Sequence, residues 1–265
     1  MMATRIQGAV THLGGQSFIV DDEKFFEPPR AGSYQNLAAE PVFGTEARLM
    51  EWITSHQPNL LVFDIAMNHI PWQTWIAVLK SSPSTRRIPI VCFGPHIALE
   101  TMSKAESVGA DGVFPRSRFV SKMVDLLSNY VREWDYPAID KACEQNISEF
   151  AREGLIAFND GDYFLAHELL EDAWNEDGSD ARDLYKGILQ VGVAYLQIER
   201  GNFRGAVKMF LRARQWLSPL PDICRGINIR QLRNDAAIAH EALLAIGPEH
   251  IAQFNRQLFK QIEFE

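Results

Sequence analysis

The first half of the chain alternates short apolar runs with segments of helical periodicity. The apolar runs cover residues 60–65, 88–93 and 112–114. Runs without period-two alternation are typical of strands that are buried on both faces, as in a parallel sheet covered by helices. Helical spacing predicts helices at residues 45–56, 72–81, 98–108 and 119–134. This alternation predicts an α/β domain with a doubly wound parallel sheet.

Beyond Pro137 the strand signals stop and helical periodicity continues to the end of the chain. The pattern predicts an all-α bundle of about six helices. We expect them at residues 138–158, 162–176, 180–200, 202–217, 228–246 and 248–261. Asp162 and Asn202 can cap helix N-termini, Gly247 can end a helix, and Pro248 suits the first turn of the next. We therefore expect an α/β domain at residues 1–136 and a helical domain at 137–265.

The alternation fails at one place, and the helical half contains a repeat. Residues 24–44, which include three prolines, do not fit a helix. Gly161-Asp162-Tyr163 and Gly201-Asn202-Phe203 begin two similar segments at a forty-residue offset. This arrangement resembles the helix pairs of tetratricopeptide repeats, and it favours a bundle built on duplicated helix pairs.

Composition indicates a globular protein outside the membrane. Hydrophobic residues make up 46% of the chain and charged residues 23%. The chain contains no apolar run long enough to form a transmembrane helix, and its N-terminus lacks the apolar core of a secretory signal. The three cysteines, Cys92, Cys143 and Cys224, are widely spaced, so neither a disulfide framework nor a thiolate zinc site is indicated. We therefore expect a protein of the reducing cytoplasm.

Charge is distributed unevenly along the helical half. The net charge of −8 argues against attraction of the whole protein to nucleic acid. Residues 144–183 contain twelve acidic and two basic residues, whereas residues 200–233 contain eight basic residues and one aspartate. Arg204, Lys208 and Arg212 recur at four-residue intervals and form a basic stripe on one helix face. The stripe is either a solvated surface, or a face opposed to the acidic helices, or a site for an anionic ligand or partner.

The first half resembles the receiver domain of two-component response regulators over residues 16–132. The resemblance rests on the segment 18–23, on Asp64 at a strand end, and on the segment 109–116. It implies that Asp64 matches the phosphoacceptor and that two of Asp21, Asp22 and Glu23 match the acidic pair that holds Mg²⁺.

Two positions depart from the receiver pattern. The Thr or Ser that contacts the phosphate falls on Gly94, which has no hydroxyl, and the Lys falls on Arg116. Phosphoryl transfer needs Mg²⁺ and a placed cation to offset charge on the phosphoryl oxygens, and an arginine supplies that charge with a different geometry. These departures favour a degenerate receiver-like docking module that is not phosphorylated. Receiver chemistry with Mg²⁺ at Asp21, Asp22, Asp64 and Arg116 is the alternative.

The second half resembles the family called domain of unknown function 309 over residues 148–220. The motifs that carry the resemblance are Phe158 to Phe164, Ala166 to Glu168 with Glu171 and Trp174, Gly187 to Gln190, and Arg200 to Ala206. The resemblance implies a helical fold and carries no activity.

His167, Glu168 and Glu171 are the candidate site of the helical half. His167 and Glu171 lie one turn apart on the same helix face, at the edge of its apolar stripe. In a structural interpretation, His167 joins a polar network with Gln190 or Tyr195 that fixes how the helices pack.

Two catalytic interpretations and a binding interpretation compete with the structural one. His-Glu-x-x-Glu resembles the zincin pattern His-Glu-x-x-His, which would make His167 and Glu171 metal ligands and Glu168 a base. That site needs a third ligand, for which His240 is a distant candidate. Without metal, a carboxylate could instead set the tautomer of His167 for acid-base catalysis. The same groups could also line a pocket for a polar ligand.

The expected function is regulation by protein-protein contact. We expect the receiver-like domain to dock onto a protein partner, including a second copy of itself, and the helical domain to act as the output or partner-binding part. No cofactor is expected beyond the possible Mg²⁺. The alternative is a metal-dependent or acid-base enzyme that uses His167, Glu168 and Glu171.

Overall fold

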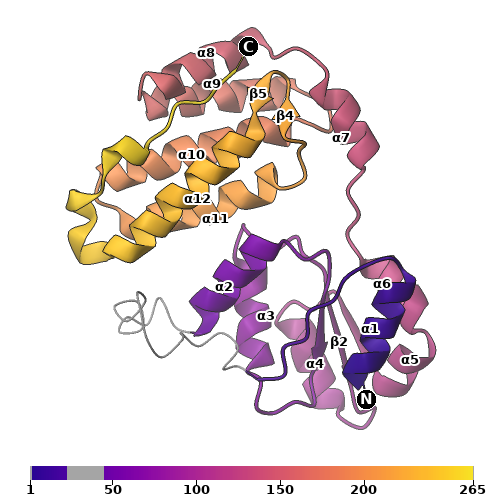
Figure 1. Cartoon of the computed structure of the whole chain (residues 1–265). Helices are drawn as coiled ribbons and strands as arrows, with labels where there is room; N and C mark the ends of the chain where they lie inside the picture. The colour runs from indigo at the N-terminus through magenta and orange to yellow at the C-terminus, as the bar shows by residue number, and fades with distance from the viewer. Residues whose placement is uncertain (1, 23–44, 265) are drawn as a thin grey trace. The chain divides into compact units, whose positions relative to one another are not determined.

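The computed structural model describes residues 2–22 and 45–264, which form two compact units (Figure 1). The chain passes from the first unit to the second between Glu133 and Trp134. The expected irregular segment 24–44 lies outside the described residues. No described helix has the length and hydrophobicity needed to cross a bilayer.

The N-terminal unit is built on a parallel sheet of three strands. The strands are β1 (Leu61–Asp64), β2 (Ile90–Gly94) and β3 (Gly112–Pro115), in the order β1-β2-β3. Val62 is opposite Val91, and Val91 is opposite Gly112. All three strands occur where the apolar runs predict them, and the predicted parallel sheet is confirmed.

Helices cover both faces of this sheet. They are α1 (Met2–His12), α2 (Thr45–His56), α3 (Trp72–Ser81), α4 (Leu99–Ser107), α5 (Arg116–Ser121) and α6 (Met123–Tyr130). Ile90 and Cys92 of β2 pack into a core with α2, α3 and α4. Val91 and Phe93 turn to the other face and pack into a second core with α5 and α6, against which α1 also lies. The alternation follows from the period of two in a strand.

The structure corrects the sequence-based expectations at three places in this unit. The helix expected at 119–134 is two helices, because Lys122 leaves the helical conformation with φ −122° and ψ 29°. The second of these helices ends at Tyr130, because Val131 leaves the helical conformation with φ −59° and ψ 130°. Helix α1 was not expected. The segment 18–20, part of the receiver resemblance, forms no regular element.

The C-terminal unit is helical, as expected. Its helices are α7 (Tyr136–Cys143), α8 (Glu149–Asn159), α9 (Tyr163–Glu176), α10 (Asp183–Glu199), α11 (Phe203–Leu217) and α12 (Ile229–Ile246). Asp162 and Asn202 cap α9 and α11, each accepting a backbone N–H at 3.0 Å. Gly247, with φ 75°, ends α12. Tyr185 and Tyr195 of α10 are among the largest fully buried side chains of this unit.

Three expectations for this unit need correction. The segment 138–158 is two helices, and Ser148 caps the second by accepting the N–H of Ala151 at 3.2 Å. The segment expected as a helix at 248–261 contains two short 3-10 helices, Pro248–Gln253 and Arg256–Leu258. A hairpin of β4 (Ile223–Cys224) and β5 (Ile227–Asn228) also lies here, where only helices were expected. Its two turn residues, Arg225 and Gly226, both have positive φ, as a type I′ hairpin turn requires.

The cysteine interpretation was wrong. Cys143 at the end of α7 and Cys224 in β4 form a disulfide across 81 residues of sequence. Their spacing could not reveal the pair, because only the fold brings the two Cα atoms to 4.4 Å. A reducing compartment was inferred from the lack of a predicted disulfide. The Cys143–Cys224 disulfide removes the basis for that inference. Cys92 is a free, buried thiol whose pKa is raised to about 12 by burial and by Asp111, so it is unreactive at neutral pH.

Candidate functional site

Asp64 and Arg116 meet at the carboxyl edge of the sheet. Asp64 ends β1 and Arg116 follows β3, and parallel strands end at the same edge. The Nη2 atom of Arg116 donates to both carboxylate oxygens of Asp64, at 2.8 and 2.7 Å. The guanidinium carbon of Arg116 lies over the ring of Phe93, 5.6 Å from the ring centroid. Phe93 belongs to β2, the strand between β1 and β3. Since the Asp64 side chain is only 17% exposed, the ion pair is shielded on one side by protein.

Gly94 ends the middle strand beside this pair. A Cβ at this position would lie 2.7 Å from Cγ1 of Ile65, which follows Asp64. A serine or threonine would therefore displace Ile65. The hydroxyl missing at this position is excluded by packing as well as by sequence.

The other receiver-like residues do not join the pair. The backbone carbonyl of Asp21 accepts a hydrogen bond from Nε2 of His69 at 2.9 Å, and the side chains of Asp21 and Asp22 are exposed. Within the described ranges, no three His, Cys, Asp or Glu side chains are arranged to hold a metal ion. Glu23 lies outside those ranges. The structure brings together Asp64 and Arg116 but not the acidic pair.

His167 lies at the edge of the buried stripe of α9. The stripe consists of Tyr163, Ala166, Leu170 and Ala173. His167 follows Ala166 and is half-buried, whereas Glu168 and Glu171 are exposed. The partners proposed in the structural interpretation do not reach His167. The Tyr195 hydroxyl bonds the backbone of Lys260, and Oε1 of Gln190 is buried with no hydrogen-bond partner among the described residues.

Among the described residues, His240 and His167 belong to no group of three candidate metal ligands. His240 is fully buried on α12, where Nδ1 lies 2.9 Å from Nη2 of Arg214. Because the guanidinium can only donate, Nδ1 is the acceptor and the imidazole is neutral.

A cluster of cations and tryptophans joins the three central helices of this unit. Nζ of Lys186 on α10 lies 3.5 Å from the ring centroid of Trp174 on α9 and 4.9 Å from that of Trp216 on α11. The guanidinium of Arg182 lies 4.2 Å from the Trp174 centroid and donates to the Trp174 carbonyl at 2.8 Å. Cation-aromatic contacts contribute about 0.5–2 kcal/mol each, so the cluster fixes how α9, α10 and α11 pack.

Arg225 is the buried residue that sequence reasoning missed. Its guanidinium donates to the Tyr185 hydroxyl at 2.6 Å and to Oγ of Ser179 at 2.7 Å, and it pairs with Asp177 at 2.7 Å. Its backbone N–H donates to the carbonyl of Cys143 at 2.7 Å. The Arg-Gly pair at 225 and 226 was the available hairpin signal. This network and the disulfide hold the same end of the helical unit.

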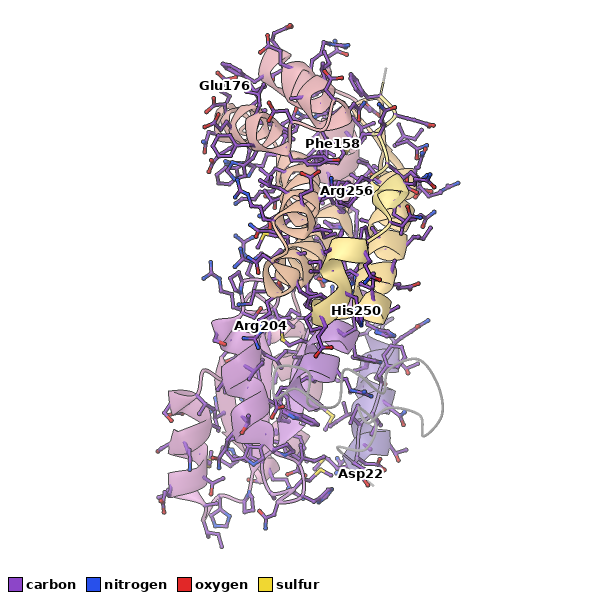
Figure 2. All side chains as sticks on the ribbon, turned by 90° about the vertical axis from the view of Figure 1, so that its left-hand side faces the viewer. Asp22, Phe158, Glu176, Arg204, His250 and Arg256 are labelled. Atoms are coloured by element: carbon purple, nitrogen blue, oxygen red, sulfur yellow. A yellow bond between two sulfur atoms is a disulfide. The ribbon has the colours of Figure 1, made fainter. Side chains whose placement is uncertain are left out.

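The basic stripe lies on α11, outside its buried face. Arg204, labelled in Figure 2, and Lys208 are exposed, and Arg212 is half-buried. The stripe therefore presents charge to solvent along two turns of the helix.

Comparison with known proteins finds a family match within the helical unit. Residues 151–209 match the family described as "Domain of unknown function (DUF309)". This match confirms the family expected for the C-terminal half. An uncharacterized protein of Aquifex aeolicus (strain VF5) is 29% identical over 87 residues, which are 32% of this chain and 26% of that protein. The chain thus covers about a quarter of that relative's length. No solved structure matches the chain.

Proposed function

We propose that this protein acts by contact with a protein partner, and that its N-terminal unit is a receiver-like docking module that works without phosphorylation. The order β1-β2-β3 in a parallel sheet covered on both faces agrees with such a module. The helical unit with the DUF309 domain is then the output or partner-binding part.

The engagement of Asp64 by Arg116 is the observation that carries the proposal. Both carboxylate oxygens accept from one guanidinium nitrogen, and this charge-assisted contact makes either oxygen a weaker nucleophile toward a phosphoryl group. Among the residues that the structure describes, no three His, Cys, Asp or Glu side chains form a metal site that would offset the charge of an incoming phosphoryl group.

The contact surfaces in this proposal are the face around Asp64 and Arg116 and the basic stripe of Arg204, Lys208 and Arg212. The first is expected to support self-association of the receiver-like unit. The second suits an acidic partner, whose affinity falls as salt increases.

Sedimentation velocity tests whether association depends on phosphorylation. The full chain and its Asp64→Asn variant are compared with and without a small phosphodonor and Mg²⁺. The proposal expects that the phosphodonor leaves the sedimentation profile of each of the two proteins unchanged. A phosphodonor-driven change in oligomeric state that Asp64→Asn abolishes would show live receiver signalling and end the proposal.

A further inference from the structure

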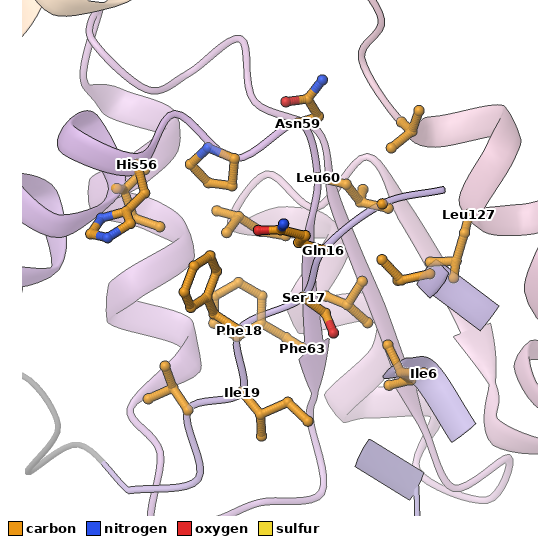
Figure 3. A pocket seen from close by; sticks show the side chains of 18 of the residues that line it. Ile6, Gln16, Ser17, Phe18, Ile19, His56, Asn59, Leu60, Phe63 and Leu127 are labelled. Atoms are coloured by element: carbon orange, nitrogen blue, oxygen red, sulfur yellow. The ribbon is translucent and has the colours of Figure 1, made fainter. Parts of the chain in front are cut away.

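A cavity of about 710 Å³ lies in the N-terminal unit beside the outer edge of β1. It is bounded by α1, the segment 14–20, α2, β1 and α6 (Figure 3). This volume is that of a site for a small organic molecule. The residues that form it are mostly apolar.

The edge of β1 presents unpaired main-chain groups to this cavity. The N–H of Leu61 donates to Pro89 at 2.9 Å and the N–H of Ile65 donates to Phe93 at 3.0 Å, so the alternate residues of the strand face β2. Val62 lies between them, and its N–H and C=O therefore point away from β2. In the described part of the chain, no backbone hydrogen bond joins residues 16–20 to β1. An unpaired donor and acceptor thus lie side by side at an apolar cavity.

Apolar and aromatic side chains bound the cavity on both faces of the strand. Figure 3 shows Phe18 and His56 on one side of β1, and Ile6 and Leu127 on the other. The ring of Phe18 lies 5.4 Å from that of Trp52 and 5.5 Å from that of His56, each edge to face. A flat molecule in the plane of the sheet would contact apolar side chains on both of its surfaces.

The charges at the cavity favour an uncharged occupant. Among the described lining residues there is no lysine or arginine. The acidic residues are Asp64, which Arg116 engages, and the exposed Glu133. An anion would find no cation in this lining, and a buried charge without a partner is costly.

We infer that the edge of β1 binds a planar, uncharged heteroaromatic molecule whose adjacent N–H and acceptor pair with the C=O and N–H of Val62. The ligand takes the place of a neighbouring strand. Its rings lie between Phe18 and Trp52 on one face of the sheet and Ile6 and Leu127 on the other. Asp64 also lines the cavity, but the inferred hydrogen bonds are made by Val62, so the inference stands whether or not the docking function does.

Lumichrome, an uncharged planar tricyclic compound with such a donor-acceptor edge, serves as the probe. Its fluorescence is titrated with the full chain, and ¹H–¹⁵N correlation spectra record the amide of Val62. We expect saturable binding and a shift of the Val62 amide signal. Val62→Pro removes the outward N–H but not an N–H of the ladder to β2, since proline is tolerated at such edge positions; it also replaces a side chain that packs on the core. It should weaken binding about tenfold.

A second variant protects the test against misfolding of Val62→Pro. Phe18 is 65% exposed, so Phe18→Ala leaves the core intact while it removes one wall of the site. It should weaken binding by up to about tenfold. Leu99 is 71% exposed and does not line the cavity, so Leu99→Ala is the matched control and should bind as the wild type does.

Three results would overturn the inference. They are the absence of saturable binding, binding that Phe18→Ala leaves unchanged, and a shift confined to amides away from Val62. Hydrogen-exchange protection and cross-strand contacts that pair residues 16–20 with β1 in the unliganded protein would also overturn it, since the chain itself would then fill the edge.

Discussion

Loss of the Cys143–Cys224 disulfide should destabilise the helical unit strongly. The bond closes a loop of 81 residues between α7 and β4. The Cα atoms of the two cysteines lie 4.4 Å apart. In the chain-entropy model, opening a loop of that length costs about 4.5 kcal/mol, because the unfolded chain regains the freedom that the bond removed. This is a large share of the stability of a domain of ordinary size, which is about 5–15 kcal/mol.

Urea unfolding of the full chain with hydrogen-exchange readout measures this loss in the helical unit separately from the N-terminal unit. With a dependence on urea of about 2 kcal/mol per molar, the midpoint of residues 134–264 should fall by about 2 M in Cys143→Ala/Cys224→Ala. A dithiol reductant should lower the wild-type midpoint by a similar amount and leave the double variant unchanged. The N-terminal unit, which contains neither cysteine, is the internal control.

Thiol titration of the freshly purified, denatured protein completes the test. We expect one thiol per chain, that of Cys92, before reduction and three after it. Three thiols before reduction, or a midpoint that neither reduction nor substitution moves, would refute the reasoning.

Three further predictions concern the helical unit. Arg225→Ala should cost about 3–5 kcal/mol in urea unfolding, because it leaves the Asp177 carboxylate buried without its cation; an unchanged midpoint would contradict this. Gly187→Ala should destabilise by about 1–3 kcal/mol, since its Cβ would overlap the side chain of Leu217, whereas Gly178→Ala meets nothing within 4 Å and is the control. Burial and Glu199 raise the pKa of Tyr163 to about 12 from an ordinary value near 10. The stability that the neutral Tyr163 contributes should therefore be complete below pH 10 and be lost as the pH rises to 12. Absorbance titration of the native tyrosines checks this window.

Local patterns predicted most of the secondary structure. The three strands and helices α2, α3, α9, α11 and α12 follow from periodicity and from caps such as Asp162 and Asn202, which act within a few residues. The failures have local causes too. The residue types at Lys122 and Ser148 do not by themselves predict a helix break. The break becomes clear only from the backbone geometry and capping hydrogen bonds around them.

Contacts between distant residues were beyond sequence reasoning. The disulfide, the Arg225 network and the Lys186–tryptophan cluster all join residues that only the fold brings together. The Asp64–Arg116 pair was anticipated because the resemblance supplied its long-range geometry. The polar partners suggested for His167 were wrong, because helical periodicity places a residue on a face but does not say which neighbouring side chain reaches it.

Intact-mass spectrometry after exposure to a small phosphodonor and Mg²⁺ tests the central claim most directly. If Arg116 keeps Asp64 from accepting a phosphoryl group, the wild-type chain gains no phosphoryl mass, in common with the Asp64→Asn control. A phosphorylated wild-type chain, with the adduct absent from Asp64→Asn, would contradict the account.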